Sequence, residues 1–282
     1  MHQARGPRPD ADNADMVEDG TDKGGTDKAG GAAVGTDELG VLRRDYRAGT
    51  LDESELAQTW LEQFRQWFDT ALACGLREPH AMVLATADAG GRPRARTVLL
   101  KQVDAAGFVW ATNYGSRKGQ DLAANPRAAL CFSWVDLERQ VHAEGAVEQL
   151  SSAESDSIFA ARPRGAQLAA WASPQSEPVA GRDELDRRLA DVSARFTRQV
   201  PRPEHWGGYR LRPVSVEFWQ GRGDRLHDRL RYRRAGGLTG APAVVDAVND
   251  ALESHPCTED DPGPLGEARA DGRSWVIERL GP

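Results

Sequence analysis

The sequence is poor in cysteine, with three in 282 residues, and it has no apolar run long enough to cross a membrane. Cys74, Cys131 and Cys257 are odd in number and lack the spacing of a metal site, so we expect reduced thiols. No apolar stretch follows a basic start at the N-terminus, as a secretory leader would require. These absences predict a cytoplasmic protein without a membrane span, a disulfide framework or a metal site.

Strong charge of one sign is also lacking once the chain is divided. Residues 1–38 hold four Lys/Arg against nine Asp/Glu, and residues 235–274 hold two against eight. The net charge of −7 therefore comes from these two segments, and the remainder carries +4. A mildly basic body suits a small anionic ligand, but it is too weakly basic to indicate nucleic-acid binding.

The composition also predicts the domain organisation. Residues 1–38 are mostly Gly, Ala, Asp and Thr and are too poor in apolar side chains to offset the entropy of ordering them, which predicts a disordered tail. Residues 39–282 are expected to form a single domain. Within it, the acidic, Gly- and Pro-containing segment at about 235–274 is expected to be a surface insertion.

Hydrophobic periodicity predicts one amphipathic helix, then strands, then further helices. Apolar side chains at three- and four-residue steps predict a helix over 52–76. Strands are expected at 81–87, 94–103, 108–112, 128–134, 140–150, 209–212, 214–220 and 275–280, and helices at 118–124, 153–161, 166–172 and 182–198. Short strands at this spacing indicate an antiparallel barrel or sandwich, mainly β with flanking helices.

Two groups of basic and polar side chains fall at strand ends. Arg96 and Lys101 bracket an apolar run; strand alternation sends Arg96, Val98 and Leu100 to one face and Thr97, Leu99 and Lys101 to the other. The turn 112–118 carries hydroxyls and two cations into a helix, which fits a phosphate site, with a solvated surface turn as the alternative. The second group spans 218–229, where each residue alone is more typical of a structural or solvated role.

Taken together, these segments resemble the pyridoxamine 5′-phosphate oxidase family from about residue 42 to 234 and again over 275–282. The matching strings are Leu42–Tyr46, Arg96–Lys101, Gly115–Lys118, Leu137–Gln140, Arg162–Arg164, Gln175-Ser176, Trp206–Gly208, Val216–Gly221 and Arg225–Arg229. So many matches in the family's order are far more specific than one short motif.

The resemblance implies an antiparallel split β-barrel and a homodimer with one FMN at each of two sites between the subunits. The residues implied to bind FMN are Arg96, Thr97, Val98, Leu99, Leu100, Lys101, Ala111, Thr112, Arg117, Lys118 and Gln140, with Gln175, Ser176, Trp219 and Arg229 expected from the second subunit. Arg117 and Lys118 would neutralise the FMN phosphate.

The same resemblance implies a phosphorylated pyridine substrate. Lys101 and Arg162 would bind its phosphate, with Ile158 and Ala166 at two further pocket positions, and Arg225, Leu226 and His227 would lie near its ring. Arg43 to Tyr46 would cover the mouth of the site. Arg225 and His227 are the implied catalytic residues, and the implied reaction is oxidation of pyridoxamine or pyridoxine 5′-phosphate by O2 to pyridoxal 5′-phosphate with release of H2O2.

The chain departs from the family pattern at the phosphate pocket. A tyrosine is expected where Ile158 stands and a serine where Ala166 stands, so two hydroxyl donors are missing unless water or Arg164 substitutes. Three hypotheses follow: pyridoxal 5′-phosphate formation with tolerated variation, a related FMN oxidase of secondary metabolism acting on a reduced phenazine-type aromatic, and a flavin or pyridoxal phosphate carrier without catalysis.

Overall fold

Backbone hydrogen bonding in the computed structural model forms one large antiparallel sheet within the residues that the structure describes, 45–235, 267–269 and 274–282. The tail predicted at 1–38, Arg43, Cys257 and most of the predicted acidic insertion lie outside these residues. None of the helices in the described part has the length and apolar character needed to cross a lipid bilayer.

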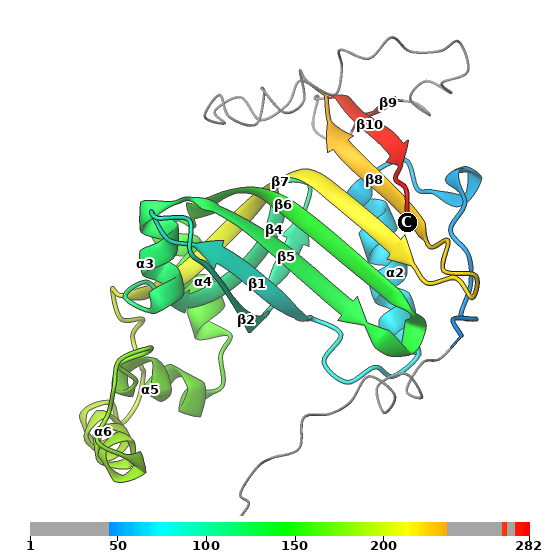
Figure 1. Ribbon diagram of the computed structural model, residues 1–282. Helices are drawn as coiled ribbons and strands as arrows, with labels where there is room; N and C mark the ends of the chain where they lie inside the picture. The colour runs from blue at the N-terminus through cyan, green and yellow to red at the C-terminus, as the bar shows by residue number, and fades with distance from the viewer. Residues whose placement is uncertain (1–44, 236–266, 270–273) are drawn as a thin grey trace, which may run out of the picture. The chain divides into compact units, whose positions relative to one another are not determined.

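The sheet has ten strands in the order β2-β1-β5-β6-β7-β8-β10-β9, and β4 pairs with both β3 and β7 (Figure 1). The strands are β1 (Ala81–Ala87), β2 (Pro93–Leu99), β3 (Gln102–Asp104), β4 (Gly107–Asn113), β5 (Arg127–Trp134), β6 (Arg139–Gln149), β7 (Trp206–Gln220), β8 (Asp228–Arg234), β9 (Glu267–Arg269) and β10 (Ser274–Arg279). The helices are α2 (Trp60–Ala73), α3 (Arg117–Ala124), α4 (Ser152–Ala160), α5 (Arg164–Ala172) and α6 (Arg182–Arg195), with short 3-10 turns η1 (Glu53–Glu55) and η2 (Val135–Leu137). The predicted class, mainly β with flanking helices, is confirmed.

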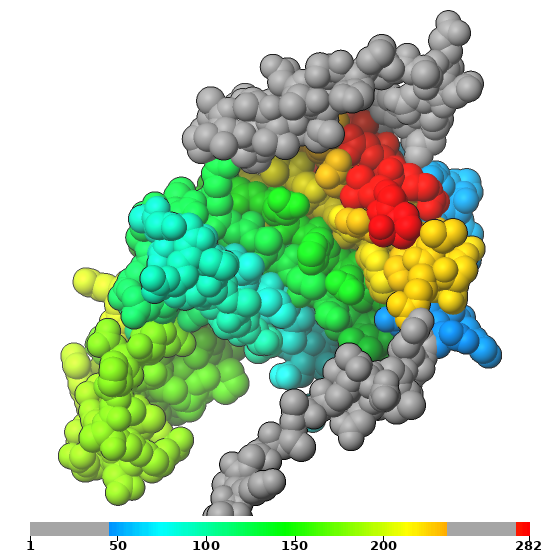
Figure 2. All heavy atoms as spheres, viewed as in Figure 1, coloured from blue at the N-terminus to red at the C-terminus, as the bar shows by residue number. Residues whose placement is uncertain are grey.

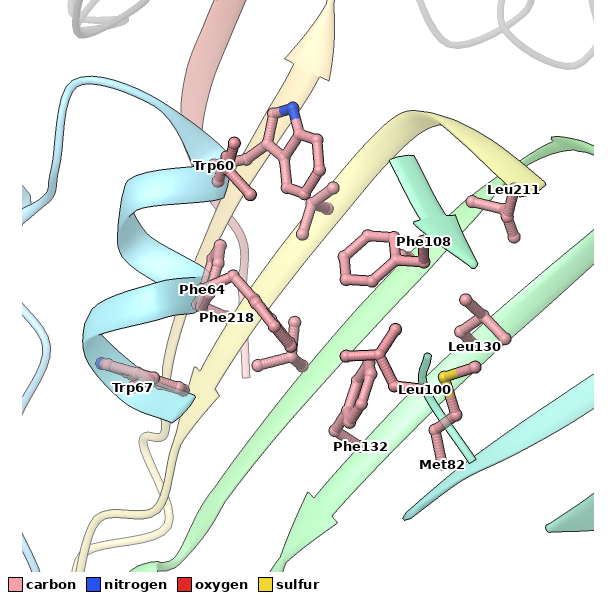
Figure 3. Close-up of a cluster of buried hydrophobic side chains, with 14 of the residues drawn as sticks. Trp60, Phe64, Trp67, Met82, Leu100, Phe108, Leu130, Phe132, Leu211 and Phe218 are labelled. Atoms are coloured by element: carbon pink, nitrogen blue, oxygen red, sulfur yellow. The ribbon is translucent and has the colours of Figure 1, made fainter. Parts of the chain in front are cut away.

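Helix α2 packs its apolar face against the core side of the sheet. Trp60, Phe64 and Trp67 are all nearly fully buried, as the periodicity predicted. The ring of Phe64 lies 5.2 Å from that of Phe108 and 5.0 Å from that of Phe132, measured between centroids (Figure 3). This core holds the strands that carry the site in one rigid framework.

Two predicted elements are longer than the observed ones. The helix expected over 52–76 begins only at Trp60, because the Thr59 side chain accepts a hydrogen bond from the Glu62 N–H and caps it there. The strand expected over 94–103 divides at Leu100 and Lys101. Their N–H groups donate to the His80 and Val109 carbonyls, so the chain changes strand partners at that point.

The last part of the sheet differs more from the prediction. The two strands expected around Pro213 are one continuous strand, β7. Its pairing with β6 shifts register between Glu144 and Gly145, opposite Pro213, so the strand continues past a residue that has no N–H to donate. Strand β8 was missed, since its sequence alternates arginines with single apolar residues and reads as a charged surface segment.

The glycine pair of β7 sets how closely α4 and the turn before α3 approach the sheet. A Cβ on Gly207 would lie 2.0 Å from Tyr114 Oη and 2.9 Å from Ser155 Oγ, and one on Gly208 would lie 2.5 Å from Leu150 Cδ1. Only glycine allows this approach. It brings α4, which carries Ile158, against β7, the strand whose C-terminal end carries the start of the second predicted site group.

Candidate functional site

A buried lysine and an arginine form the centre of the first part of the site. Lys118 Nζ donates to Thr112 Oγ1 at 3.0 Å and to Gln175 Oε1 at 3.2 Å, while Arg96 Nη1 donates to the Leu84 carbonyl at 3.0 Å. We call Arg96, Thr112, Lys118 and Gln175 the cation cluster. Gln175 is expected to reach FMN from the second subunit; within the chain it accepts a hydrogen bond from Lys118, and we group it with that residue.

Burial strongly perturbs this lysine. Desolvation, followed by the like charge of Arg96, lowers the pKa of Lys118 from its usual 10.5 to about 8. Its described partners are neutral oxygens of Thr112, Ser116 and Gln175, so none offsets its charge. A desolvated cation without a counter-ion at a helix start is suited to receive an anion.

A second pair of cations consists of Lys101, which follows β2, and Arg162, which precedes α5. Burial and then the charge of Arg162 lower the pKa of Lys101, even though part of the Lys101 side chain reaches solvent. Arg162 stacks 4.7 Å from the Trp206 ring and donates to the Ala166 carbonyl at 2.8 Å, but its Nε is buried without a hydrogen-bond partner. The charge of Arg162 thus acts on Lys101, the residue with which it is expected to bind the substrate phosphate.

The two departures from the family pattern lie beside this pair. Ile158 packs into a small apolar cluster around Phe159 and Trp206, and Ala166 contributes only its carbonyl, to Arg162. Arg164, suggested as a substitute donor, is bonded instead to the carbonyls of Arg198 and Phe196. We therefore do not assign it to the pocket.

The other half of the predicted residues lies on a different surface. Gln140 of β6 pairs with Trp219 of β7, and Trp219 pairs with Arg229 of β8, which forms a row across three strands. We call these three residues the outer-face group. They line one pocket together with His142, Glu217 and Pro282, which sequence reasoning missed because they are distant in sequence or look like surface positions. Glu217 fixes Arg229 by two bonds, of 2.8 and 3.1 Å.

Aromatic rings gather next to this group. Tyr46 lies 5.8 Å from Trp219 and 5.6 Å from His227, and Trp219 lies 4.8 Å from His227, between ring centroids. His227 Nδ1 accepts from the Arg222 N–H at 3.0 Å. The structure thus brings together the predicted cover residue Tyr46 and the predicted catalytic residue His227.

Glu138 binds the segment 45–48, which we call the cover segment, and the sequence analysis assigned it no role. One carboxylate oxygen accepts the N–H groups of both Arg47 and Ala48, each at 2.7 Å. Glu138 adopts a left-handed backbone with φ of 55°, as do Ser176 at 76° and Arg225 at 66°. Glu78 is the fourth such residue in the described chain, at 52°. Non-glycine residues in this conformation cluster at functional sites, and two of these four, Ser176 and Arg225, were predicted site residues.

The remaining predicted residues follow from their elements. Thr97 and Leu99 lie on β2 with Val98, Leu100 is buried in the core, Ala111 is half-buried on β4, Arg117 is exposed at the start of α3, and Ser176, Arg225 and Leu226 are exposed in loops. Val98 and Leu100 share the inner side with Arg96, as alternation predicted.

The cation cluster and the outer-face group lie on opposite faces of the sheet. Arg96 pairs with Leu84, and Leu84 with Leu130, both fully buried, so Arg96 is on the core side. Gln140, Trp219 and Arg229 instead alternate with buried residues such as Phe218 and Leu230 and are on the other side. One ligand bound within a single chain therefore cannot contact both groups.

Comparison with known proteins agrees with this geometry. Residues 68–196 match the family model of pyridoxamine 5′-phosphate oxidase, and residues 206–254 match the pyridoxine 5′-phosphate oxidase C-terminal dimerisation region. A pyridoxine/pyridoxamine 5′-phosphate oxidase of Thermosynechococcus vestitus is 59% identical over 195 residues, which cover 69% of this chain and 92% of that protein. The Rubrobacter xylanophilus protein of the same name is 58% identical over 200 residues, covering 71% and 92%.

Solved structures extend the comparison to the fold. PhzG from Burkholderia lata, in complex with tetrahydrophenazine-1-carboxylic acid, superposes with a TM-score of 0.67 at 27% identity, covering 83% of this chain and 98% of that one. A pyridoxamine 5′-phosphate oxidase-related, FMN-binding protein of Nostoc punctiforme shares the fold, with a TM-score of 0.54 at 17% identity, covering 78% and 97%. From the model matches and the identities above 55%, the chain belongs to the pyridoxine/pyridoxamine 5′-phosphate oxidase family.

Proposed function

We propose that the chain is an FMN-dependent oxidase of pyridoxamine 5′-phosphate and pyridoxine 5′-phosphate. The observation that carries this proposal is the presence of two separate cation pairs, Arg96 with Lys118 and Lys101 with Arg162. The first suits the phosphate of FMN, and the second suits the phosphate of the substrate. The relatives at 58–59% identity that are named for this activity support the same assignment.

The residues fit both anions. Lys118 is a desolvated cation with only neutral partners, and Arg162 keeps a buried Nε that lacks an acceptor. A phosphate oxygen would supply the acceptor that Arg162 Nε lacks and the counter-charge that Lys118 lacks, and an unsatisfied buried donor such as Arg162 Nε costs about 1–3 kcal/mol. When bound, the flavin supplies the chemistry of accepting a hydride and passing the electrons to O2.

The side chains then have distinct roles. Lys101 and Arg162 bind the substrate phosphate, Arg225 and His227 orient the carbon that carries the amine or alcohol, and Tyr46 covers the mouth. Pyridoxine 5′-phosphate and O2 give pyridoxal 5′-phosphate and H2O2. Pyridoxamine 5′-phosphate also consumes one water and releases ammonia.

The opposite-face arrangement supports a homodimer in which each FMN contacts the cation cluster of one subunit and the outer-face group of the other. The matched dimerisation region supports it as well. On the same side as the outer-face group, β1 and β5 present small apolar side chains, including the exposed Val83. Figure 2 shows this face of the sheet open toward the viewer. An apolar sheet face of this kind favours contact with a second copy.

A second candidate function rests on Ile158 and Ala166, whose apolar side chains would suit a substrate without a phosphate. The likeness to PhzG, whose structure contains a reduced phenazine acid, is compatible with it. Identity of 27% to that protein against 58–59% to the oxidases favours the phosphorylated substrate.

The test is oxygen uptake by the FMN-loaded protein supplied with pyridoxamine 5′-phosphate, pyridoxine 5′-phosphate or a dihydrophenazine acid, with the aldehyde product followed by absorbance. We expect uptake with the two phosphates and matching pyridoxal 5′-phosphate. An Arg225→Ala variant should retain FMN and lose turnover. Uptake only with the phenazine acid would reject the proposed substrate, and flavin binding without any uptake would favour a carrier.

A further inference from the structure

A buried carboxylate lies directly behind the cation cluster. Asp121 of α3 is 2% exposed, and its Oδ1 accepts from Arg94 Nη1 at 2.6 Å. Its Oδ2 accepts from the Thr86 hydroxyl at 2.8 Å and lies 3.7 Å from Arg96 Nη2. Neither the resemblance nor the sequence analysis singled out Asp121 or Thr86.

Thr86 connects this carboxylate to the first cation of the cluster. The same hydroxyl that donates to Asp121 accepts from Arg96 Nη1 at 2.8 Å. Arg96 Nη1 also donates to the Leu84 carbonyl at 3.0 Å, so Arg96 has two fixed acceptors and a carboxylate behind it. Because a guanidinium is planar, these bonds leave it little rotational freedom.

Helix α3 ties this arrangement to Lys118. Lys118 and Asp121 are three residues apart and both buried, so they lie on the same face of α3, against the sheet. Arg94 and Arg96 of β2 and Lys118 of α3 are three cations near one another, and Asp121 is the buried carboxylate that contacts the two arginines. Its negative charge offsets the mutual repulsion of Arg94 and Arg96.

Building on the FMN assignment above, we propose that Asp121 is a positioning residue for the cofactor phosphate. Through Thr86 it holds Arg96 in its binding orientation before the phosphate arrives. A positioning role and a purely electrostatic role predict opposite changes in FMN affinity when Asp121 loses its charge. Removing a negative charge near a phosphate site would by Coulomb's law strengthen phosphate binding, whereas losing the orientation of Arg96 weakens it.

The test measures the dissociation constants of FMN and of riboflavin, which lacks the phosphate, by flavin fluorescence in wild type and Asp121→Asn. An asparagine oxygen can accept from Arg94 or from Thr86, and its amide faces the other donor. We expect the FMN constant to rise about tenfold, the scale of one weakened charge-assisted hydrogen bond, and the riboflavin constant to stay unchanged.

Two further variants separate the role from a loss of folding. Asp88→Asn alters the other carboxylate on Arg94, 3.1 Å away, and should leave FMN affinity unchanged. Thr86→Val keeps the shape of Thr86 and the Asp121–Arg94 pair, so it should reproduce the phosphate-selective loss even if Asp121→Asn does not fold.

The outcomes also separate this inference from the proposed cofactor. Equal or tighter FMN binding by Asp121→Asn, or by Thr86→Val where that variant alone folds, would overturn the positioning role. A loss of equal size for riboflavin would do the same, because it would indicate general damage. A wild-type protein that does not prefer FMN over riboflavin would overturn the proposed cofactor itself.

Discussion

Lys118 is a cation whose protonation is sensitive to what binds beside it. Its pKa of about 8 reflects burial first and the charge of Arg96 second. A bound phosphate dianion would favour the charged form and raise that pKa again. The complex would then hold more protons than the free protein at and above this pH, so FMN binding and proton binding at Lys118 are linked.

We therefore expect FMN affinity to fall as the pH rises above about 8, up to tenfold per pH unit. Below that pH the lysine is charged with or without FMN, and the affinity should be level. The measurement is a series of flavin fluorescence titrations in buffers between about pH 6.5 and 9.5, a range that brackets the Lys118 pKa of about 8.

The matched control for this pH dependence is Lys118→Arg. A guanidinium stays charged throughout the range, so the slope above pH 8 should disappear in this variant. Riboflavin, which has no phosphate, should show no slope with either protein. A slope that persists in Lys118→Arg would assign the titration to another group.

At the scale of elements, the turn between η2 and β6 determines where the cover segment lies. Glu138 in that turn binds the N–H groups of Arg47 and Ala48, and its carbonyl accepts from the Gly221 N–H at 2.8 Å. The same residue thus connects the segment that carries Tyr46 to the end of β7, next to Trp219.

Replacing Glu138 by Asn should release the cover segment without straining the turn, because Asn tolerates a left-handed backbone but is too short to reach. We expect the KM for pyridoxamine 5′-phosphate to rise about tenfold, since two hydrogen bonds to a carboxylate are lost. Steady-state kinetics checks this, and faster tryptic cleavage after Arg47 provides an independent readout. Glu138→Gln keeps the acceptor and should behave like wild type; if it is equally impaired, the tether is not the cause.

Helix α2 closes the core, so its buried face should dominate stability. Phe64→Ala removes a ring that is 1% exposed and meets four other rings, and we expect a loss of about 3–5 kcal/mol in the free energy of unfolding. Leu72→Ala on the exposed side of the same helix should change it by less than about 0.5 kcal/mol. Urea denaturation followed by tryptophan fluorescence measures both, and similar shifts would contradict the assigned packing.

Helices and strands could be predicted where buried residues recur at a regular period. They could not be predicted where strand pairing determines which residues are buried. The buried face of α2 could be predicted because Trp60, Phe64 and Trp67 repeat at helical steps. Strand β8 could not, since only its neighbours β7 and β10 reveal its buried residues. Among site residues, the resemblance indicated Lys118 and Arg162, but Asp121, Glu138 and Glu217 act by supporting other side chains. Nothing local in the sequence marks such a role.

At the scale of the whole molecule, the two parts of the site lie on opposite faces of the sheet of one chain. If each FMN contacts the cation cluster of one subunit and the outer-face group of the other, two defective proteins can complement each other. A variant damaged in the first part still carries an intact second part, and the reverse holds as well.

Mixing Lys118→Met with Arg229→Ala, a variant of the outer-face group, under conditions that exchange subunits should therefore restore activity. Half of the dimers would be mixed, each with one intact site, so about a quarter of wild-type turnover is expected at equal amounts. Oxygen uptake before and after exchange measures this. As a control, mixing Lys118→Met with Arg96→Ala, both in the cation cluster, should restore nothing. Recovery in that control, or none in the first mixture, would contradict a shared site.

The opposite-face arrangement also makes FMN binding depend on the concentration of the protein. If a flavin needs two chains to be held, cofactor affinity and subunit affinity reinforce each other by mass action. Dilution below the dimer dissociation constant should then release FMN even where free flavin would saturate an intact site. The FMN concentration, in turn, would determine how many chains are dimeric and how much of the small apolar surface of β1 and β5 is exposed. A shortage of FMN would therefore be detected first as dissociation of the dimer.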